Sequence, residues 1–308
     1  MNQYHGVCLS WELIDSVLEV ELHRGPCNEI GTTTLRELEL LASFVKAGAG
    51  GARAMITYST RRGGFSAGAD LRELYHGMNR SNAGFLKSVL GTLRPSEDLT
   101  TSVRSVMQDV AWQTAEEGRK ALSSKLLVRQ VGRFLRRIHA VFNTLDEAPF
   151  LTIAATHGVV FGGGFELALV HDIIIADKSA RFAFPELRLG LVPGFGGIPR
   201  LERDVGNAVV RDLLLTGRSL NARRAHAVGL VSQVTARDKA LTAARSMANQ
   251  AKRFAPEVMA AGKAFAKPIP RERLDLEIQT FLTLVRDPRV LAALDTFVHS
   301  DDVRPYLP

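Results

Sequence analysis

Two short apolar stretches each carry a single glutamate. Residues 161–169 place Glu166 after three glycines and a phenylalanine, and residues 184–190 place Glu186 directly after a proline. An ionised carboxylate among Phe, Leu and Ala is costly to bury, so such a residue tends to have a raised pKa and to serve in proton transfer. The fold must therefore compensate the cost of burying both carboxyl groups. Together the two glutamates can supply an acid and a base.

Two loops rich in small residues can supply backbone N–H groups to a ligand oxygen. Gly162, Gly163 and Gly164 precede the helix expected around Glu166, and glycines at a helix start let an anion approach the bare amides. Residues 65–71 form a similar loop, which ends the strand-like run 54–58 and opens a helix with Asp70 near its start. Two such sources of N–H groups aimed at one point predict an oxyanion hole.

These segments resemble the crotonase superfamily, the enoyl-CoA hydratase and isomerase family. The resemblance covers roughly residues 10–75 and 130–265, and it is specific because the motifs occur in the family's order. The motifs are residues 66–71, 157–169, 182–190, 192–201, 215–219 and 222–231. The resemblance implies an α/β crotonase (ClpP/crotonase-like) fold, with a core of repeated ββα units and a C-terminal helical region that packs in trimers.

The resemblance also implies roles for individual residues. Glu166 is expected to accept the proton of an attacking water, and Glu186 to deliver a proton to the α-carbon. The N–H groups of Ala69 and Gly163 are expected to form the oxyanion hole. Further residues are expected to bind the substrate or coenzyme A: Ala67, Gly68, Asp70, Arg72, Gly194 and Lys263.

Among these binding residues, Gly194 is expected to hold the water through its backbone, while Arg72 and Lys263 are expected near coenzyme A phosphates. The substrate implied is an acyl-CoA thioester, with no metal and no further cofactor.

Local patterns agree with an α/β core. Residues 17–22 alternate apolar and acidic side chains as a half-buried strand does, and a helix capped by Thr32, Thr33 or Thr34 is expected to follow. Further strands are expected at 52–58, 151–155 and 173–176, and helices at 256–267, 271–286 and 290–299.

These patterns divide the chain into a core, residues 1–200, and a C-terminal helical region, residues 201–308. The core is expected to carry a helical insertion at about 73–128, which can act as a lid, reshape substrate choice or merely decorate the surface.

Composition narrows the class of protein without deciding its function. The net charge of +7 fits a nucleic acid, an acidic membrane or a phosphate-rich ligand, and it fits an inert basic surface equally well. Two cysteines are too few for a disulfide framework, and no apolar run is long enough to span a membrane. We therefore expect a soluble cytoplasmic protein. Asp146 and Glu147 are expected on a solvated helix face.

Several activities remain open at this point. Retention of Glu166 favours hydration, because family isomerases commonly keep only the carboxylate that matches Glu186. Dehydratases, decarboxylases and C–C bond hydrolases of the superfamily reuse the same oxyanion hole.

A protein that binds RNA or partners without catalysis is the alternative from a different class. Arg129, Arg133, Arg136 and Arg137 could form its basic stripe, although they lack the interleaved aromatic residues of a stacking platform. For the enzyme, the resemblance implies a homotrimer or a dimer of trimers.

Overall fold

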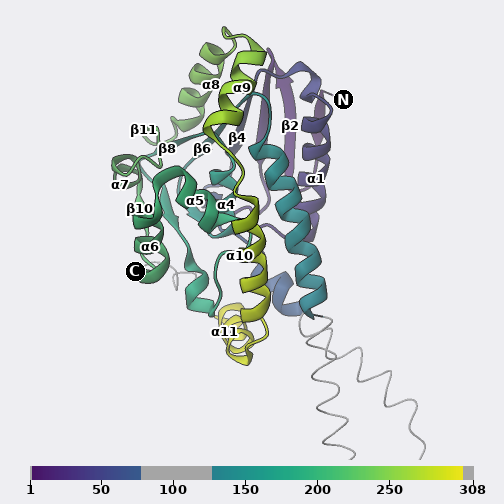
Figure 1. Cartoon of the computed structure of the whole chain (residues 1–308), viewed down its shortest axis with the longest axis vertical. Helices are drawn as coiled ribbons and strands as arrows, with labels where there is room; N and C mark the ends of the chain where they lie inside the picture. Colours follow the sequence, from purple (N-terminus) through teal and green to yellow (C-terminus); the bar gives the residue numbers. More distant parts are fainter. Residues whose placement is uncertain (1, 78–126, 301–308) are drawn as a thin grey trace, which may run out of the picture.

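The computed structural model describes residues 2–77 and 127–300, which form two β-sheets surrounded by helices (Figure 1). The larger sheet has seven strands in the order β1-β2-β3-β4-β6-β8-β11. Its strands are β1 (Gln3–His5), β2 (Leu9–Ile14), β3 (Val17–Leu22), β4 (Ala54–Ser59), β6 (Leu151–Thr156), β8 (Ile173–Asp177) and β11 (Gln233–Thr235). The first three strands pair antiparallel, and the pairs from β3 to β11 are parallel.

Three of the four strands of the smaller sheet each follow directly after a parallel strand of the larger one. Its order is β10-β9-β7-β5. The strands are β5 (Gly64–Ser66), β7 (Val159–Phe161), β9 (Arg181–Ala183) and β10 (Leu220–Asn221). Three times in succession the chain passes through the larger sheet, then the smaller sheet, and then a helix or helical turn. This arrangement is the predicted core of repeated ββα units.

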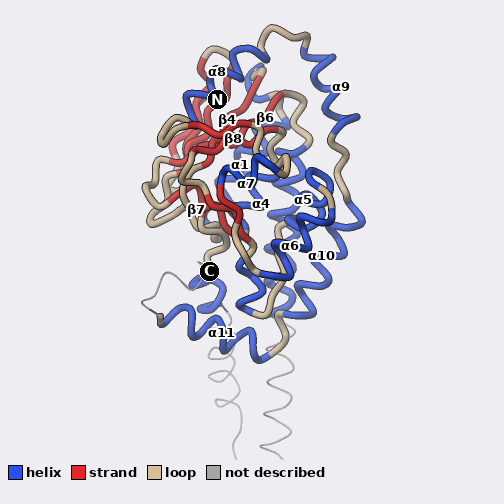
Figure 2. The backbone as a smooth tube through the Cα atoms, turned by 90° about the vertical axis from the view of Figure 1, so that its left-hand side faces the viewer, coloured by secondary structure: helices blue, strands red, loops and turns tan. Residues whose placement is uncertain are grey.

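The helices cover both faces of the larger sheet (Figure 2). They are α1 (Thr32–Lys46), α4 (Gly163–Leu169), α5 (Gly197–Val205), α6 (Asn207–Thr216), α7 (Ala222–Ala227), α8 (Ala240–Ala251), α9 (Pro256–Ala266), α10 (Arg271–Leu284) and α11 (Pro288–His299). Short 3₁₀ turns are η1 (Ala49–Gly51) and η2 (Pro185–Leu189). Residues 71–77 and 127–146 are also helical.

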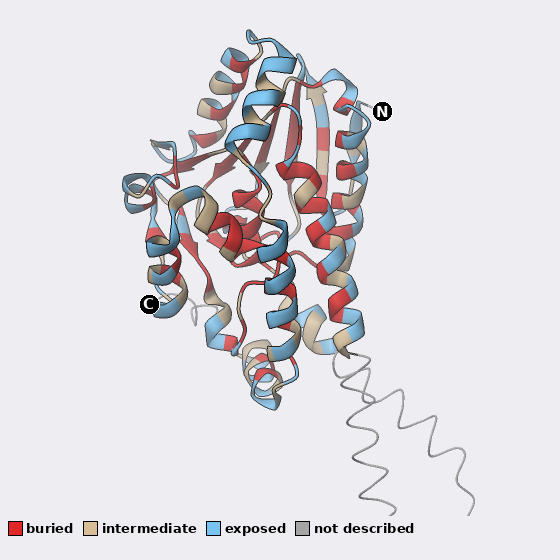
Figure 3. Cartoon of the chain, viewed as in Figure 1, coloured by how far each residue is buried: buried red, intermediate tan, exposed pale blue. Residues whose placement is uncertain are grey.

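Alternation of side chains along the strands separates two apolar cores. Ala54, Ile56 and Ile153 face α8, whose buried alanines recur every three or four residues and so form one narrow stripe. The neighbouring residues, such as Met55 and Ala154, face the larger core on the other side. Figure 3 shows that buried residues gather along the sheet and at α4 and α5, whereas α9 contains no buried residue.

The structure confirms the expected strands and the helical character of the C-terminal third, and it corrects the predicted start of the first helix. The N-cap of α1 is Gly31, and no threonine side chain caps the helix. Instead, the Thr32 N–H donates to Glu73 Oε2 at 2.8 Å, so a carboxylate from the next helical segment satisfies the helix start.

The predicted domain boundary at residue 200 does not separate two packing units. Strand β11 lies beyond that boundary and pairs with β8 in the larger sheet, and α8 packs against β4, β6 and β8. The insertion predicted at about 73–128 lies almost wholly outside the described residues. In the described ranges, no helix is both long and apolar enough to cross a membrane.

Candidate active site

The loop after β5 leaves one backbone amide available at its tip. The Ala67 N–H donates to Cys27 O at 2.8 Å, and the Gly68 N–H donates to the Ser66 hydroxyl at 3.2 Å. The Asp70 N–H donates to Ile30 O at 3.1 Å. Within the described part of the chain, the Ala69 N–H is left without an acceptor. The loop therefore presents one amide, the one that the sequence predicts for the oxyanion hole.

The glycine loop before α4 brings a second amide beside the first. Gly162 has a φ of 48°, in the left-handed region that favours glycine, and it turns the chain from β7 into α4. A Cβ added at Gly163 would lie 3.3 Å from the Ala69 nitrogen, and one added at Gly68 would lie 3.1 Å from the Gly163 nitrogen. The two loops are thus in contact at the two predicted donors.

Glu166 lies in the first turns of α4 with only 1% of its surface exposed. Its Oε1 accepts two hydrogen bonds, from the Phe195 N–H at 2.7 Å and from the Gly197 N–H at 2.8 Å. Burial raises the pKa of Glu166 to about 7, although these amides and the nearby Arg200 charge act to lower it. One oxygen is therefore anchored, and the carboxyl group can change its protonation state near neutral pH.

Glu186 lies in the turn η2, on the other side of the glycine loop. The residue is partly exposed as a whole, but its Oε2 is buried and, among the described residues, has no hydrogen-bond partner. A Cβ added at Gly162 would lie 2.6 Å from Glu186 Oε1, so the carboxyl group lies against the loop that carries Gly163. Burial and then the charge of Glu166 raise the pKa of Glu186 well above its ordinary value.

The comparisons with known proteins agree with this geometry. The model of the family described as enoyl-CoA hydratase/isomerase matches residues 124–297, more than half of the chain. The chain belongs to the enoyl-CoA hydratase/isomerase family. Its fold is therefore the crotonase fold, as the sequence predicts.

Individual relatives are similar over about half of their length. The chain is 40% identical over 150 residues to the carnitinyl-CoA dehydratase of Proteus mirabilis (strain HI4320), covering 49% of this chain and 56% of that protein. It is 36% identical over 162 residues to the mitochondrial methylglutaconyl-CoA hydratase of Rattus norvegicus, covering 52% and 51%. The chain thus spans about half the length of these relatives.

A solved structure extends the likeness to the whole fold. The crystal structure of enoyl-CoA hydratase from Bacillus halodurans matches 94% of this chain and 99% of that chain with a TM-score of 0.69. The sequence identity is 19%, so this likeness shows the fold alone.

Three family-implied binding residues take positions that clarify their roles. Asp70 pairs with Arg24 at 2.5 Å and accepts from the Glu73 N–H, so its carboxylate holds the loop in place. Arg72 is exposed and, in the described ranges, forms no ion pair, which leaves it available to a phosphate. Gly194 is buried beneath the ring of Phe281, and its N–H acts to lower the pKa of Glu166.

Lys263 is held by groups of its own chain. Its ammonium pairs with Asp172 at 2.9 Å and donates to Phe150 O at 3.2 Å, and its side chain is 9% exposed. Lys267 bridges Asp172 and Asp146 in the same way. Both lysines are thus paired with carboxylates, and the coenzyme A contact predicted for Lys263 stays a prediction.

Sequence reasoning missed the groups that hold the glycine turn at residues 194–198. His139 donates from Nε2 to Gly194 O at 2.8 Å, which fixes the Nε2–H tautomer because a carbonyl can only accept. Arg200 donates to the carbonyls of Phe195 and Gly196, and Glu277 accepts from two amides of the turn. The sequence does carry a signal for Glu277, because this residue falls at helical spacing within the apolar stripe of residues 274, 278 and 281, all of which are buried.

Asp146 is also not on a solvated face, contrary to prediction. Its side chain is fully buried and pairs with Arg200 at 2.8 Å, with Arg203 at 3.1 Å and with Lys267 at 2.8 Å. Glu147, in contrast, is exposed and pairs with Arg271, as expected of a solvated residue.

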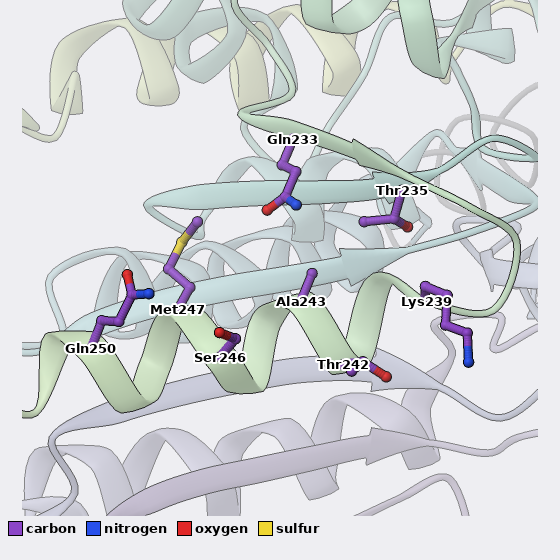
Figure 4. Close-up of a pocket in the computed structure, with 8 residues that line it drawn as sticks. All are labelled: Gln233, Thr235, Lys239, Thr242, Ala243, Ser246, Met247 and Gln250. Atoms are coloured by element: carbon purple, nitrogen blue, oxygen red, sulfur yellow. The ribbon is translucent and has the colours of Figure 1, made fainter.

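A groove of about 440 Å³ lies elsewhere, between β11 and α8 (Figure 4). Gln233 and Thr235 line it from the strand, and Lys239, Ser246 and Gln250 from the helix side. It is open to solvent, and none of its lining residues has a predicted catalytic or binding role.

Proposed function

We propose that this chain is an enoyl-CoA hydratase, which adds water to a 2-enoyl-CoA thioester through an enolate held in an oxyanion hole. One observation carries the proposal. Among the described residues the amides of Ala69 and Gly163 have no acceptor and lie close together, in loops that also carry or contact two buried carboxyl groups, those of Glu166 and Glu186. Amides that face a carbonyl oxygen stabilise the charge that collects there, by about 3 kcal/mol for each donor.

The two carboxyl groups take complementary roles in the proposed reaction. Glu166 keeps Oε1 on the amides of the glycine turn, so Oε2 is the oxygen that receives the proton of the attacking water. Water adds to the β-carbon, charge moves to the thioester oxygen, and Glu186 returns a proton to the α-carbon. Dehydration is the same path in reverse.

The pKa shifts support this division of roles. Glu166 has a pKa of about 7 and can be ionised at neutral pH, whereas the charge of Glu166 helps keep the proton on Glu186. We expect kcat to rise as the pH passes about 7, when Glu166 becomes ionised, and to fall at higher pH as Glu186 loses its proton. A pH profile of kcat on the preferred thioester measures both limbs.

The proposal is tested with crotonyl-CoA and with longer and aromatic enoyl-CoA thioesters, by following loss of the conjugated chromophore. Glu166→Gln and Glu186→Gln are each expected to slow hydration by about 100-fold to 10,000-fold while thioester binding persists. Glu12→Gln, an exposed change on β2, is the matched control and is expected to leave the rate unchanged.

Two outcomes would replace the proposal. If Glu166→Gln keeps full activity and the product is a shifted double bond, the chain is an isomerase that relies on Glu186. If no thioester binds, but RNA is retained in a salt-dependent way by wild type and Glu166→Gln alike, the basic surface is the functional part.

The active form proposed is a homotrimer or a dimer of trimers. Helix α9 and the residues before it support this, because Phe254, Val258 and Phe265 are 60%, 69% and 93% exposed. Large apolar side chains exposed together commonly mark a surface that another chain covers. Light scattering of the purified full chain measures the mass, and a monomer at micromolar concentration would exclude this assembly.

A further inference from the structure

Glu277 is a buried glutamate that the proposed reaction does not use. It lies on α10, which is about 80 residues from the glycine turn in sequence, and only 5% of its surface is exposed. Its Oε1 accepts from the Gly196 N–H at 2.6 Å, and its Oε2 accepts from the Ile198 N–H at 3.0 Å. Both carboxylate oxygens are therefore bonded to the backbone of the turn.

The amides of this turn alternate between two carboxyl groups. Phe195 and Gly197 donate to Glu166, whereas Gly196 and Ile198 donate to Glu277. Four successive N–H groups are thus divided between a glutamate on α4 and a glutamate on α10. Gly196 makes the alternation possible, because its φ of 99° turns its amide away from those of its neighbours.

We propose that Glu277 is a positioning residue: it holds the turn in the conformation that presents the amides of Phe195 and Gly197 to Glu166. The inference rests on the proposed function, because it concerns how Glu166 is held ready to accept a proton. Glu277 does not need to touch the substrate. It acts through the turn, because the two amides that it accepts, those of Gly196 and Ile198, alternate with the two that donate to Glu166.

The groups around Glu277 set its pKa. Burial and then the charge of Glu166, which lies on α4, raise the pKa of Glu277 well above its ordinary value, although the two amides of the turn and Arg200 on α5 act to lower it. His139 approaches the turn from the helix 127–146 and is bonded to Gly194 O, and Glu186 interacts with Glu166 from η2. Asp275, on α10 itself, acts on His139. Glu277 therefore acts on Glu166 through the geometry of the turn and not through a like charge.

Substitution of Glu277 should therefore have two separable effects. Loss of amide acceptors loosens the turn and misplaces Glu166, which lowers kcat, while binding of the coenzyme A portion and hence KM should change little. The amides of Phe195 and Gly197 act to lower the pKa of Glu166, so a loosened turn lets that pKa rise and moves the acid limb of the kcat profile to higher pH. A residue with a purely structural role would not move that limb.

The test compares Glu277→Gln, Glu277→Leu and the control Glu272→Gln in the full chain. Glutamine keeps the size of the side chain and one oxygen acceptor, whereas leucine keeps neither acceptor. Glu272 is exposed in the first turn of the same helix, so its variant makes the same side-chain change without contacting the glycine turn. All three are assayed for kcat, KM and the pH profile on the thioester that wild type hydrates fastest.

We expect Glu277→Gln to lower kcat by about 10-fold to 100-fold and to move the acid limb up by about one pH unit, with KM nearly unchanged. Glu277→Leu should lower kcat further, and Glu272→Gln should match wild type. An unchanged kcat and acid limb in folded Glu277→Gln would overturn the proposal, as would a loss seen equally in Glu272→Gln.

A second readout separates this inference from the proposed function. Amide hydrogen exchange of Phe195 and Gly197, measured by NMR without substrate, should be faster in Glu277→Gln than in wild type. If wild type hydrates no thioester but this exchange still rises, the proposed reaction fails and the positioning contact stands. If wild type is active and the exchange is unchanged, the positioning role is refuted and the proposed function stands.

Discussion

Two buried carboxyl groups near Arg200 have opposite protonation behaviour. Asp146 is surrounded by cations, and although burial alone would raise its pKa, the charges of Lys267, Arg200 and Arg203 lower it. Glu166 is equally buried but bonds only to backbone amides, and burial raises its pKa to about 7. The same cation lies close to both, so the difference comes from the other partners.

The two carboxyl groups therefore serve different ends in one region of the fold: one stabilises the packing of helices, and the other can exchange a proton. Full ion pairs fix Asp146 as a permanent anion that ties the helix 127–146 to α5 and α9. Backbone amides orient Glu166 but compensate its charge only in part, so its proton can come and go. The predictions below alter one side of this comparison at a time.

The largest effect on stability is expected from Asp146→Asn. The change leaves the cations Arg200, Arg203 and Lys267 buried with too little negative charge, which should cost about 3–5 kcal/mol of unfolding free energy at pH 7. Because the pKa of Asp146 is lowered on folding, its stabilisation is present above its ordinary pKa and is lost as the pH falls through the folded value.

Urea unfolding of Asp146→Asn between pH 3 and pH 7 measures this cost. The difference from wild type should shrink toward the acid end of the range. A constant difference would mean that the cost is one of packing and not of charge.

Glu166→Gln should act in the opposite direction. Folding raises the pKa of Glu166 from 4.5 to about 7. The contribution of this residue to the unfolding free energy of the wild type is therefore fully present below pH 4.5 and is lost as the pH rises through 7. At about 1.4 kcal/mol per pKa unit, the variant should be more stable by about 3 kcal/mol above pH 8 and little changed at pH 4. Thermal and urea unfolding of the variant and the wild type at both pH values measure this difference. A variant that is less stable than wild type at pH 8 would contradict the burial argument.

A smaller effect on the unfolding free energy is expected where Phe195 of the glycine turn packs against Gly163 of the glycine loop. A Cβ at Gly163 would lie 2.6 Å from Phe195 Cε2, so Gly163→Ala should cost about 1–3 kcal/mol through overpacking. The cost should be much lower in a Phe195→Ala background, because the ring that blocks the methyl group is gone. A double-mutant cycle of unfolding free energies tests this, and additive costs would show that the two groups do not meet.

The smallest effect is expected at the residue next to Asp146 in sequence. Glu147 is exposed and pairs with Arg271 on the surface, so Glu147→Gln should change the unfolding free energy by less than about 1 kcal/mol. The same denaturant series as for Asp146→Asn provides the measurement. A cost as large as that of Asp146→Asn would show that charge density, and not burial, controls this region.

Local sequence patterns predicted the parts of the site that lie within continuous segments. The loops around Ala69 and Gly163 and the two glutamates are each flanked by their own glycines and apolar neighbours, so each motif carries its own signal. The strands at 17–22 and 151–155 were predictable for the same reason, since a strand's alternation is local.

The groups that hold these motifs could not be predicted, because their partners are far away in sequence. Asp146 and Arg200 are 54 residues apart, and Glu277 and Gly196 are 81 residues apart. A charged residue near a helix end is usually solvated, so only tertiary packing distinguishes Asp146 from Glu147. The pairing of Lys263 with Asp172 could not be predicted for the same reason, because it depends on how α9 packs.

The most direct test of the account is the protonation of Glu166 itself. Infrared spectra of wild type minus Glu166→Gln, recorded from pH 4 to pH 9 in D₂O, isolate the protonated carboxyl band of this residue. The account predicts a band present at pH 5 that is lost with a midpoint of about 7. A midpoint near the ordinary value of 4.5 would contradict it, because Glu166 would then be a permanent anion like Asp146.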